Sequence, residues 1–120
     1  MSSSARSVFV FSLYMFILGL MLIAVPNVLL RLFAVAETYE VWIRIVGVLV
    51  LILGFYYFQA SRSEIKIFFQ WTVYGRTAVF VFFISFVIAD LAPPILILFG
   101  FIDAVAALWT HLSLRSEKYA

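Results

Sequence analysis

The stretch VWIRIVGVLVLILGFYYFQA, from Val41 to Ala60, decides the fold class of the chain. It carries one charged residue, Arg44, in a run that is otherwise almost entirely apolar or aromatic. A hydrocarbon core of about 30 Å is crossed by about 20 helical residues, which is the length of this run. The stretch therefore predicts a membrane-spanning helix and sets the length to look for in the rest of the chain.

Three more apolar runs of similar length cover residues 8–25, 69–89 and 95–114. The first ends before Pro26, and the last follows a proline pair that ends at Pro94. Because proline lacks an amide donor and suits the first turn of a helix, we expect Pro94 to open the last helix. The runs are too long and too evenly apolar for barrel strands. The sequence therefore predicts an all-α membrane protein, an antiparallel bundle of four transmembrane helices.

Composition agrees with this prediction and excludes several classes of protein. Of the 120 residues, 67% are hydrophobic and 12% are charged, whereas a soluble domain is about 45–50% apolar. The net charge of +2 is small and scattered, so we expect no nucleic-acid partner. The absence of cysteine excludes disulfides and thiolate metal sites. We expect one four-helix transmembrane domain over residues 1–120.

The positions of lysine and arginine in the short connections predict the orientation in the membrane. One side of the predicted bundle carries Arg6, Arg62, Lys66, Arg115 and Lys118. This side is expected to be cytoplasmic, which places both termini in the cytoplasm. The tryptophans fall near the ends of the predicted spans, where an aromatic belt forms, at Trp42, Trp71 and Trp109.

Three segments outside the predicted spans are interpreted separately. Residues 27–40 read NVLLRLFAVAETYE, and the apolar residues around Arg31 fit either a short interfacial helix or a simple extension of the first helix. The serines at 2–4 are interpreted as an ordinary polar start. SRSEIK, at 61–66, is interpreted as a solvated connection with affinity for anionic lipid.

Arg44, Arg76 and Asp103 are charged residues inside the predicted spans. A charge that faces lipid near the bilayer centre costs about 2.5–3.5 kcal/mol on insertion scales. Arg44 lies roughly 5 Å below the outer boundary, within reach of the headgroups. Asp103 lies roughly 12 Å deep, and its short side chain cannot reach them. Asp103 is therefore expected to be paired, hydrogen-bonded, in contact with water or protonated.

Arg76 lies about 8–10 Å from the inner boundary if its helix begins near residue 69 or 70. At that depth the side chain must stretch to reach the headgroups, so protein partners are an alternative. Besides lipid phosphate, the partners considered for Arg76 are Gln70, Thr72, Tyr56 and Tyr57.

The neighbours of Arg44 and Asp103 indicate which way these side chains point. Each charge lies on a helical face with small residues. The first face is formed by Arg44, Gly47, Leu51 and Gly54, and the second by Gly100, Asp103 and Ala107. Small residues allow membrane helices to approach closely, so both charges are expected to face the bundle interior. Side chains lean toward the N-terminus of their helix, so Arg44 and Asp103 lean toward the outer side of the membrane and Arg76 leans toward the inner side. Arg44–Asp103 is therefore the preferred intramembrane ion pair, and Arg76–Asp103 is the second.

The set Arg44, Arg76 and Asp103 fits either structural contacts within the bundle or a site for a ligand or a proton. Tyr56, Tyr57 and His111 are secondary candidates, although His111 is interpreted as interfacial because it lies near the inner edge of its span. The sequence has no phosphate loop, no HExxH and no nucleophile elbow. We therefore assign no catalytic residue, no metal site and no cofactor.

The order of these features resembles that of small bacterial four-helix membrane proteins. The similar features are the first helix ending at Pro26, the segment LLRLFAVAETYEVW at 29–42, Arg44 with Gly47 and Gly54, and the acidic Asp103 in the last helix. The chain is similar in these respects to the DoxX-like group and related families of unknown function. The resemblance implies an inner-membrane location, and some members are associated with quinone-linked oxidoreductase complexes. Because the sequence has no redox ligand, only fold and location carry over.

Three functions fit the sequence. The favoured one is a non-catalytic accessory, assembly or scaffold subunit that contacts membrane lipid and binds protein partners or copies of itself. It rests on the small size, the short connections and the lack of catalytic constellations. The alternative is a small protein that binds or transports a lipid-like ligand or solute at the Arg/Asp cluster. The third is an enzyme that acts on a lipid or a quinone.

Overall fold

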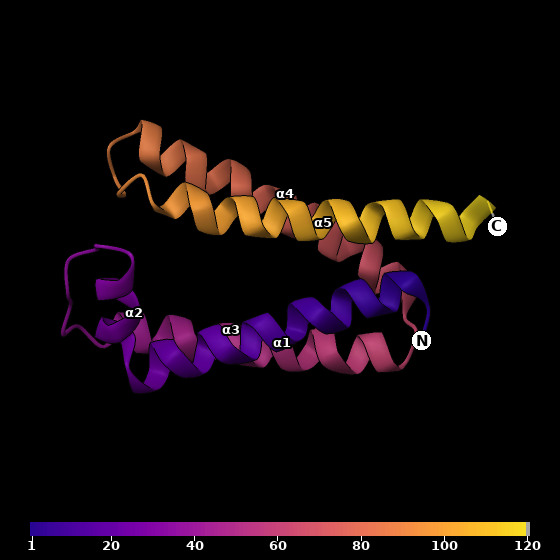
Figure 1. Cartoon of the computed structure of the whole chain (residues 1–120), viewed down its shortest axis with the longest axis horizontal. Helices are drawn as coiled ribbons and strands as arrows, with labels where there is room; N and C mark the ends of the chain where they lie inside the picture. Colours follow the sequence, from indigo (N-terminus) through magenta and orange to yellow (C-terminus); the bar gives the residue numbers. More distant parts are fainter. Residues whose placement is uncertain (120) are drawn as a thin grey trace. The chain divides into compact units, whose positions relative to one another are not determined.

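A computed structural model describes residues 1–119, and all regular secondary structure in this range is helical. The helices, shown in Figure 1, are α1 (Ser3–Ala24), α2 (Pro26–Leu32), α3 (Trp42–Arg62), α4 (Lys66–Ile88) and α5 (Leu96–Tyr119). The predicted all-α fold is confirmed.

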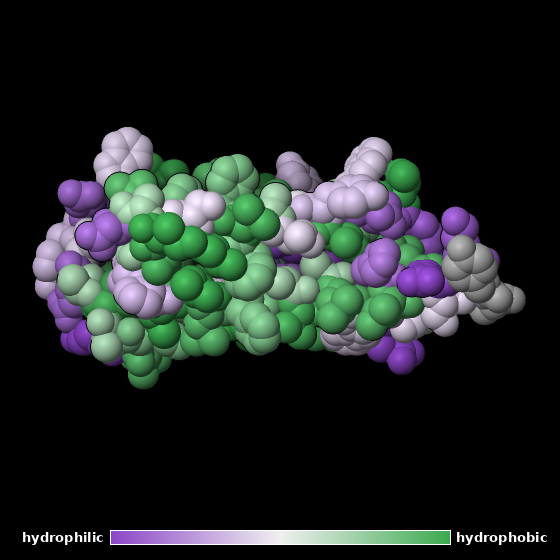
Figure 2. Space-filling view, turned by 90° about the horizontal axis from the view of Figure 1, so that it is seen from above, coloured by the Kyte–Doolittle hydropathy of each residue, from purple (hydrophilic) through white to green (hydrophobic). Residues whose placement is uncertain are grey.

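Four of these helices are long and apolar enough to cross a membrane: α1, α3, α4 and the Leu96–Lys118 part of α5. They have 21 to 23 residues each, and at about 1.5 Å per residue each one exceeds a hydrocarbon thickness of about 30 Å. Hydrophobic side chains cover much of the face seen in Figure 2. The chain is a multi-pass membrane protein.

The break between α1 and α2 follows from Pro26. Val25 leaves the helical conformation, with φ −139° and ψ 58°, and Pro26 occupies the first turn of α2. Proline has no amide to continue the hydrogen bonds of α1, and its ring obstructs the preceding turn. The short helix around Arg31 is thus separate, and the alternative of a simple extension of the first helix is wrong.

Three helices end in the same tight turn, which uses a non-glycine residue with positive φ. Ala34 follows α2 with φ 55°, Glu64 follows α3 with φ 54°, and Asp90 follows α4 with φ 61°. After α3, the amide of Ile65 donates to the carbonyl of Ala60 at 3.1 Å. This pattern is a Schellman motif, which satisfies carbonyls that a helix end leaves without partners. The SRSEIK segment is therefore an ordered turn that fixes where Glu64 lies.

The chain divides into two compact units, and the first comprises residues 9–59. Here α1 and α3 run antiparallel and meet at glycines. A Cβ built on Gly47 would lie 2.8 Å from Leu22 Cβ and 2.9 Å from the carbonyl oxygen of Gly19. A Cβ built on Gly54 would lie 3.0 Å from Met15 Cβ. The prediction that this glycine face allows close helix contact is confirmed.

The second unit comprises residues 1–8 and the chain from Ala60 onward. Here α4 and α5 run antiparallel, and Gly100 allows their close approach, because a Cβ there would lie 3.2 Å from Phe80 Cα and 3.3 Å from Phe83 Cβ. The beginning of α1 packs on the same pair, with Ser7 bonded to Thr110. This unit holds most of the polar side-chain contacts described below.

Candidate functional site

Arg76 is the centre of a buried polar network in the second unit. Its side chain is only 2% exposed. Nε donates to the carbonyl of Thr72 at 3.1 Å, and Nη2 donates to the hydroxyls of Thr72 and Thr110, each at 2.9 Å. These bonds draw the guanidinium back toward the start of α4, as the tilt of helical side chains predicts. Protein groups therefore bind Arg76, and Thr72 is confirmed as a partner.

Thr110 extends the network from Arg76 to the beginning of α1. Its hydroxyl lies 2.7 Å from the Ser7 hydroxyl, and Ser7 donates its proton to the carbonyl of Ser4 at 2.6 Å. The Thr110 hydroxyl also accepts a hydrogen bond from Nη2 of Arg76, so it joins Arg76 to Ser7. The Thr110 hydroxyl also donates to the carbonyl of Ala106 at 3.2 Å. The result is a chain of hydrogen bonds from α4 through α5 to α1.

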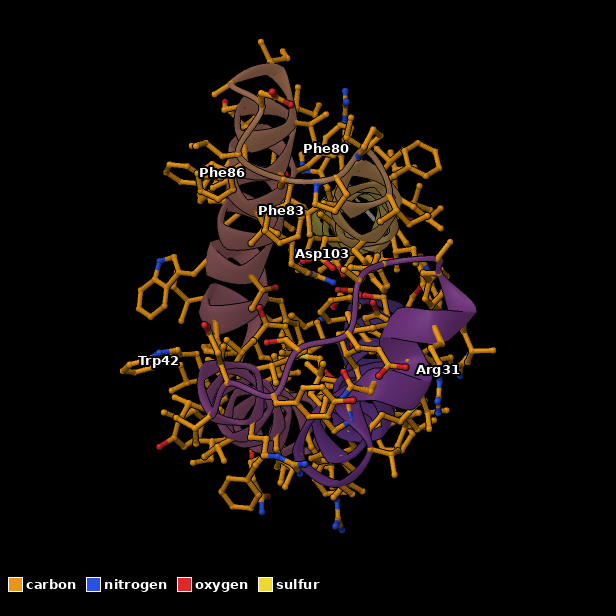
Figure 3. All side chains as sticks on the ribbon, turned by 90° about the vertical axis from the view of Figure 1, so that its left-hand side faces the viewer. Arg31, Trp42, Phe80, Phe83, Phe86 and Asp103 are labelled. Atoms are coloured by element: carbon orange, nitrogen blue, oxygen red, sulfur yellow. The ribbon has the colours of Figure 1, made fainter. Side chains whose placement is uncertain are left out.

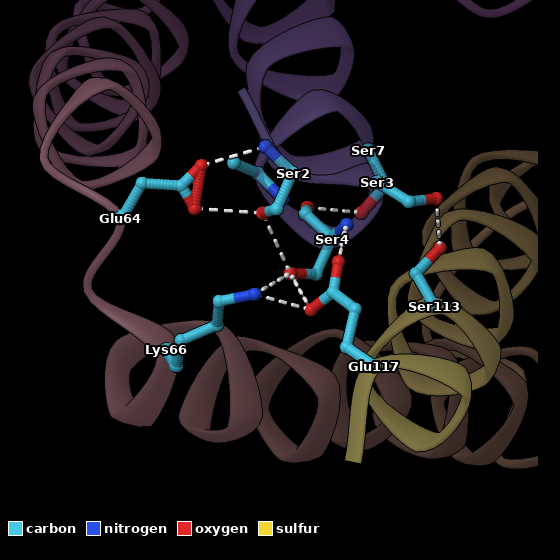
Figure 4. Close-up of polar contacts among 9 residues, drawn as sticks. Ser2, Ser3, Ser4, Ser7, Glu64, Lys66, Ser113 and Glu117 are labelled. Carbon is cyan, nitrogen blue, oxygen red and sulfur yellow. Dashed lines mark hydrogen bonds and ion pairs between the residues drawn. The ribbon is translucent and has the colours of Figure 1, made fainter. Parts of the chain in front are cut away.

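Two carboxylates bind the first turn of α1, where helical amides have no partner within the helix. Glu64 accepts from the amide and the hydroxyl of Ser2, each at 2.7 Å. Glu117 accepts from the amide of Ser4 at 2.8 Å and from its hydroxyl at 2.7 Å, and it forms an ion pair with Lys66. Figure 4 shows this cluster. Negative charge at a helix N-terminus is stabilising, so both carboxylates hold α1 in place.

These contacts correct the interpretation of the serines at 2–4 as an ordinary polar start. Ser2 caps α1, because its hydroxyl accepts from the amide of Ala5 at 3.1 Å. Serine before an apolar run is a known N-cap signal, and it explains why α1 begins at Ser3, ahead of the predicted span. The bonds to Glu64 and Glu117 join residues far apart in the chain, and no local pattern predicts them.

Glu64 gives the cluster a pH dependence. Hydrogen bonds from the amide and then the hydroxyl of Ser2 lower the pKa of the Glu64 carboxyl below its ordinary value of 4.5. A pKa lowered in the folded state means that ionised Glu64 adds stability above the unfolded-state pKa, and that this stability is lost as the pH falls through the folded-state pKa.

We therefore expect Glu64→Gln to lower the thermal stability in detergent at neutral pH, and we expect the difference from wild type to shrink once the pH falls below 4.5. Glu40→Gln is the matched control, since Glu40 is exposed on another connection. If the difference in thermal stability between Glu64→Gln and wild type stays constant over the whole pH series, the role given to Glu64 is contradicted.

Asp103 lies on α5 one helical turn from Gly100 and is half-buried. Within its unit it forms no hydrogen bond and no ion pair with a residue that the structure describes. Arg76 is the charged group that interacts with it electrostatically. Among the described residues of its own unit, the Asp103 carboxyl therefore lacks the hydrogen bonds that Arg76 has.

Arg44 belongs to the other unit, where it is exposed, and its Nη1 donates to the carbonyl of Ile23 near the end of α1. A cation near the C-terminus of a helix is favourable, so this contact stabilises α1. The predicted Arg44–Asp103 ion pair would join the two units and stays a prediction.

Of the secondary candidates, Tyr56 and Tyr57 belong to the unit of residues 9–59, and His111 lies on α5. Tyr56 is exposed on α3, and the ring of Tyr57 packs at 5.8 Å from that of Phe11. His111 is exposed on α5. Within residues 1–119, no three side chains of the kinds that ligate metals converge on one point.

Comparison with known proteins gives no match, whether with family models, curated proteins or solved structures. The similarity to DoxX-like proteins therefore stays a prediction. What the geometry does provide is a set of polar groups that bind one another. Arg76, Thr110 and Ser7 connect three helices, and Glu64 and Glu117 fix the end of one of them.

Proposed function

We propose that the chain is a non-catalytic accessory, assembly or scaffold subunit of a membrane, and that both termini face the cytoplasm. The observation that carries this proposal is the use of Arg76. A buried guanidinium in a membrane span is a candidate for function by default, but the donors described here bind Thr72 and Thr110 of the same chain. This use supports a structural role over a catalytic one.

A scaffold also needs a surface for its partner, and α4 has a suitable one. Gly75 is exposed, and a Cβ built on it meets no atom within 4 Å. Ala78 and Trp71 are exposed on the same helix. Small residues let a neighbouring helix approach closely in a membrane, where apolarity alone drives no association. We take this surface, Trp71, Gly75 and Ala78, as the contact for another membrane protein or a second copy.

Gentle purification followed by native mass spectrometry tests the proposal. We expect a protein partner or a second copy to remain bound to the wild-type chain. We expect Gly75→Leu to lose that partner and keep its thermal stability, because the added side chain fills space that only the partner uses. Val81→Leu, at an exposed position of the same helix, is the control and should keep the partner. A wild-type chain that is always monomeric, even with lipid retained, contradicts the proposal.

A bacterial inner-membrane location accompanies the proposal, with support from the resemblance to DoxX-like proteins alone.

One observation favours a second function, the binding of a small ligand. It is the Asp103 carboxyl, which has no hydrogen-bond partner within its unit.

A further inference from the structure

The beginning of α1 lies beside the end of α5 in the second unit, and two hydrogen bonds fix how they align. The Ser3 hydroxyl lies 3.0 Å from the Ser113 hydroxyl (Figure 4), and the Ser7 hydroxyl lies 2.7 Å from that of Thr110. Residue numbers rise along α1 while they fall along α5, so the two helices run antiparallel. Both contacts lie near one end of two candidate membrane spans, where the hydrocarbon core meets the headgroups.

Helical geometry places an arginine and a tryptophan on one side of this helix pair. Arg6 lies three residues after Ser3, Trp109 lies four residues before Ser113, and both side chains are exposed within their unit. At 3.6 residues per turn, these steps turn Arg6 by about 60° and Trp109 by about 40° from their serines, in the same sense about each helix's own direction. Because the helices are antiparallel, both turns lead to the same side of the pair.

The two side chains start at similar depths but lean in opposite directions. Arg6 lies about 4.5 Å and Trp109 about 6 Å from the contact between Ser3 and Ser113, toward the middle of the spans. Helical side chains lean toward the N-terminus of their helix, so Arg6 leans back to the level of Ser3 and Trp109 leans deeper. A long cationic side chain reaches the phosphate level in this way, and an indole suits the level below it.

Hydroxyl groups lie at the level toward which Arg6 leans. Ser3 and Ser113 have two hydroxyl protons, and the hydrogen bond between them uses one. Among residues 1–119, no group accepts the other proton, and none accepts a hydrogen bond from the Arg6 guanidinium. Ser116, three residues after Ser113, adds an exposed hydroxyl on the same side. These groups supply donors and positive charge, so a ligand that fits them supplies anionic oxygens.

From these observations we infer that Arg6, with Ser3 and Ser116, forms a binding site for the phosphate of an anionic phospholipid, and that Trp109 contacts the same lipid below its phosphate. Arginine binds phosphate oxygens through paired, charge-assisted hydrogen bonds. Free phosphate offers the same oxygens, but the position of Trp109 favours a ligand that continues into the hydrocarbon. The site is one defined position at the α1–α5 pair, separate from the general affinity for anionic lipid expected of SRSEIK. It goes beyond the accessory role, and either one can hold without the other.

The test titrates the full chain in a neutral detergent with phosphatidylglycerol or with phosphatidylcholine of the same acyl chains, and native mass spectrometry counts the bound lipids. We expect the wild type to bind one phosphatidylglycerol more tightly than phosphatidylcholine. Arg6→Gln should bind phosphatidylglycerol at least about tenfold more weakly, since it loses a charge-assisted contact. Arg6→Lys keeps the charge and should bind more tightly than Arg6→Gln. Arg115→Gln is the matched control, because Arg115 is also exposed but lies two residues after Ser113 and faces away from α1, and it should bind like wild type.

Thermal unfolding checks that each variant is folded, and fluorescence gives a second measurement. With Trp109 as the only tryptophan, after Trp42→Phe and Trp71→Phe, brominated phosphatidylglycerol should quench the emission more than brominated phosphatidylcholine. This comparison keeps Arg6, so it decides the matter even if Arg6→Gln does not fold. Equal quenching by the two lipids, or equal losses of binding in Arg6→Gln and Arg115→Gln, overturns the inference. Displacement of the lipid by excess inorganic phosphate would indicate a site for free phosphate and overturns it as well.

Discussion

Thr110→Val is expected to lower the free energy of unfolding in detergent by about 1.5–3 kcal/mol, the range for a hydrogen bond to a charged group. Valine has nearly the shape of threonine but no hydroxyl. The change removes one of the two hydroxyls that accept from Nη2 of Arg76, and it removes the hydrogen bond between Thr110 and Ser7. Since Arg76 is only 2% exposed, water cannot readily replace the lost contact.

Thr77→Val is the matched control for this change. Thr77 is exposed, and its hydroxyl donates to the carbonyl of Val73 within its own helix. The same chemical change should therefore alter the stability by less than about 0.5 kcal/mol. Equal losses in the two variants would show that the buried network contributes nothing specific.

Gly47→Ala is expected to destabilise the unit formed by residues 9–59 by about 1–3 kcal/mol, which is the usual cost of overpacking. The new methyl group would lie 2.9 Å from the carbonyl oxygen of Gly19 and 2.8 Å from Leu22 Cβ. The first of these atoms belongs to the backbone, so it can move only if α1 shifts relative to α3. Alanine has a higher helix propensity than glycine, which adds stability. The measured loss of stability is therefore the cost of overpacking minus this gain.

The control for this prediction is Gly75→Ala. A Cβ at Gly75 meets no atom within 4 Å, so only the helix propensity changes. This variant should be neutral or more stable by up to about 1 kcal/mol. Thermal unfolding in the same detergent compares the two alanines, and a loss at Gly75 as large as at Gly47 would refute the packing argument.

The sequence predicted the features of this chain that depend on local pattern. The four long helices follow from apolar runs of spanning length, and the break at Pro26 follows from the chemistry of proline. The close contact at Gly47 and Gly54 follows from their helical spacing. Each of these features involves residues within one helix or one turn, so the pattern is visible without the fold.

The polar network could be predicted only in part, because its contacts depend on how helices align. Thr72 was a predicted partner of Arg76 because it lies four residues away on the same helix. Thr110 was missed, although it continues the spacing of Gly100 and Ala107, because the alignment of α4 against α5 decides what it meets. The partners of Glu64 and Glu117 depend on the same tertiary arrangement.

A double-mutant cycle on Arg76 and Thr110 tests whether Arg76 has a structural role through the bond between these two side chains. The cycle compares Thr110→Val in wild type and in Arg76→Leu, by unfolding in detergent. We predict that the loss caused by Thr110→Val is at least about 1 kcal/mol smaller in the Arg76→Leu background, since the bond is already absent there. If Thr110→Val causes the same loss of unfolding free energy in wild type and in Arg76→Leu, the structural role of this bond is contradicted.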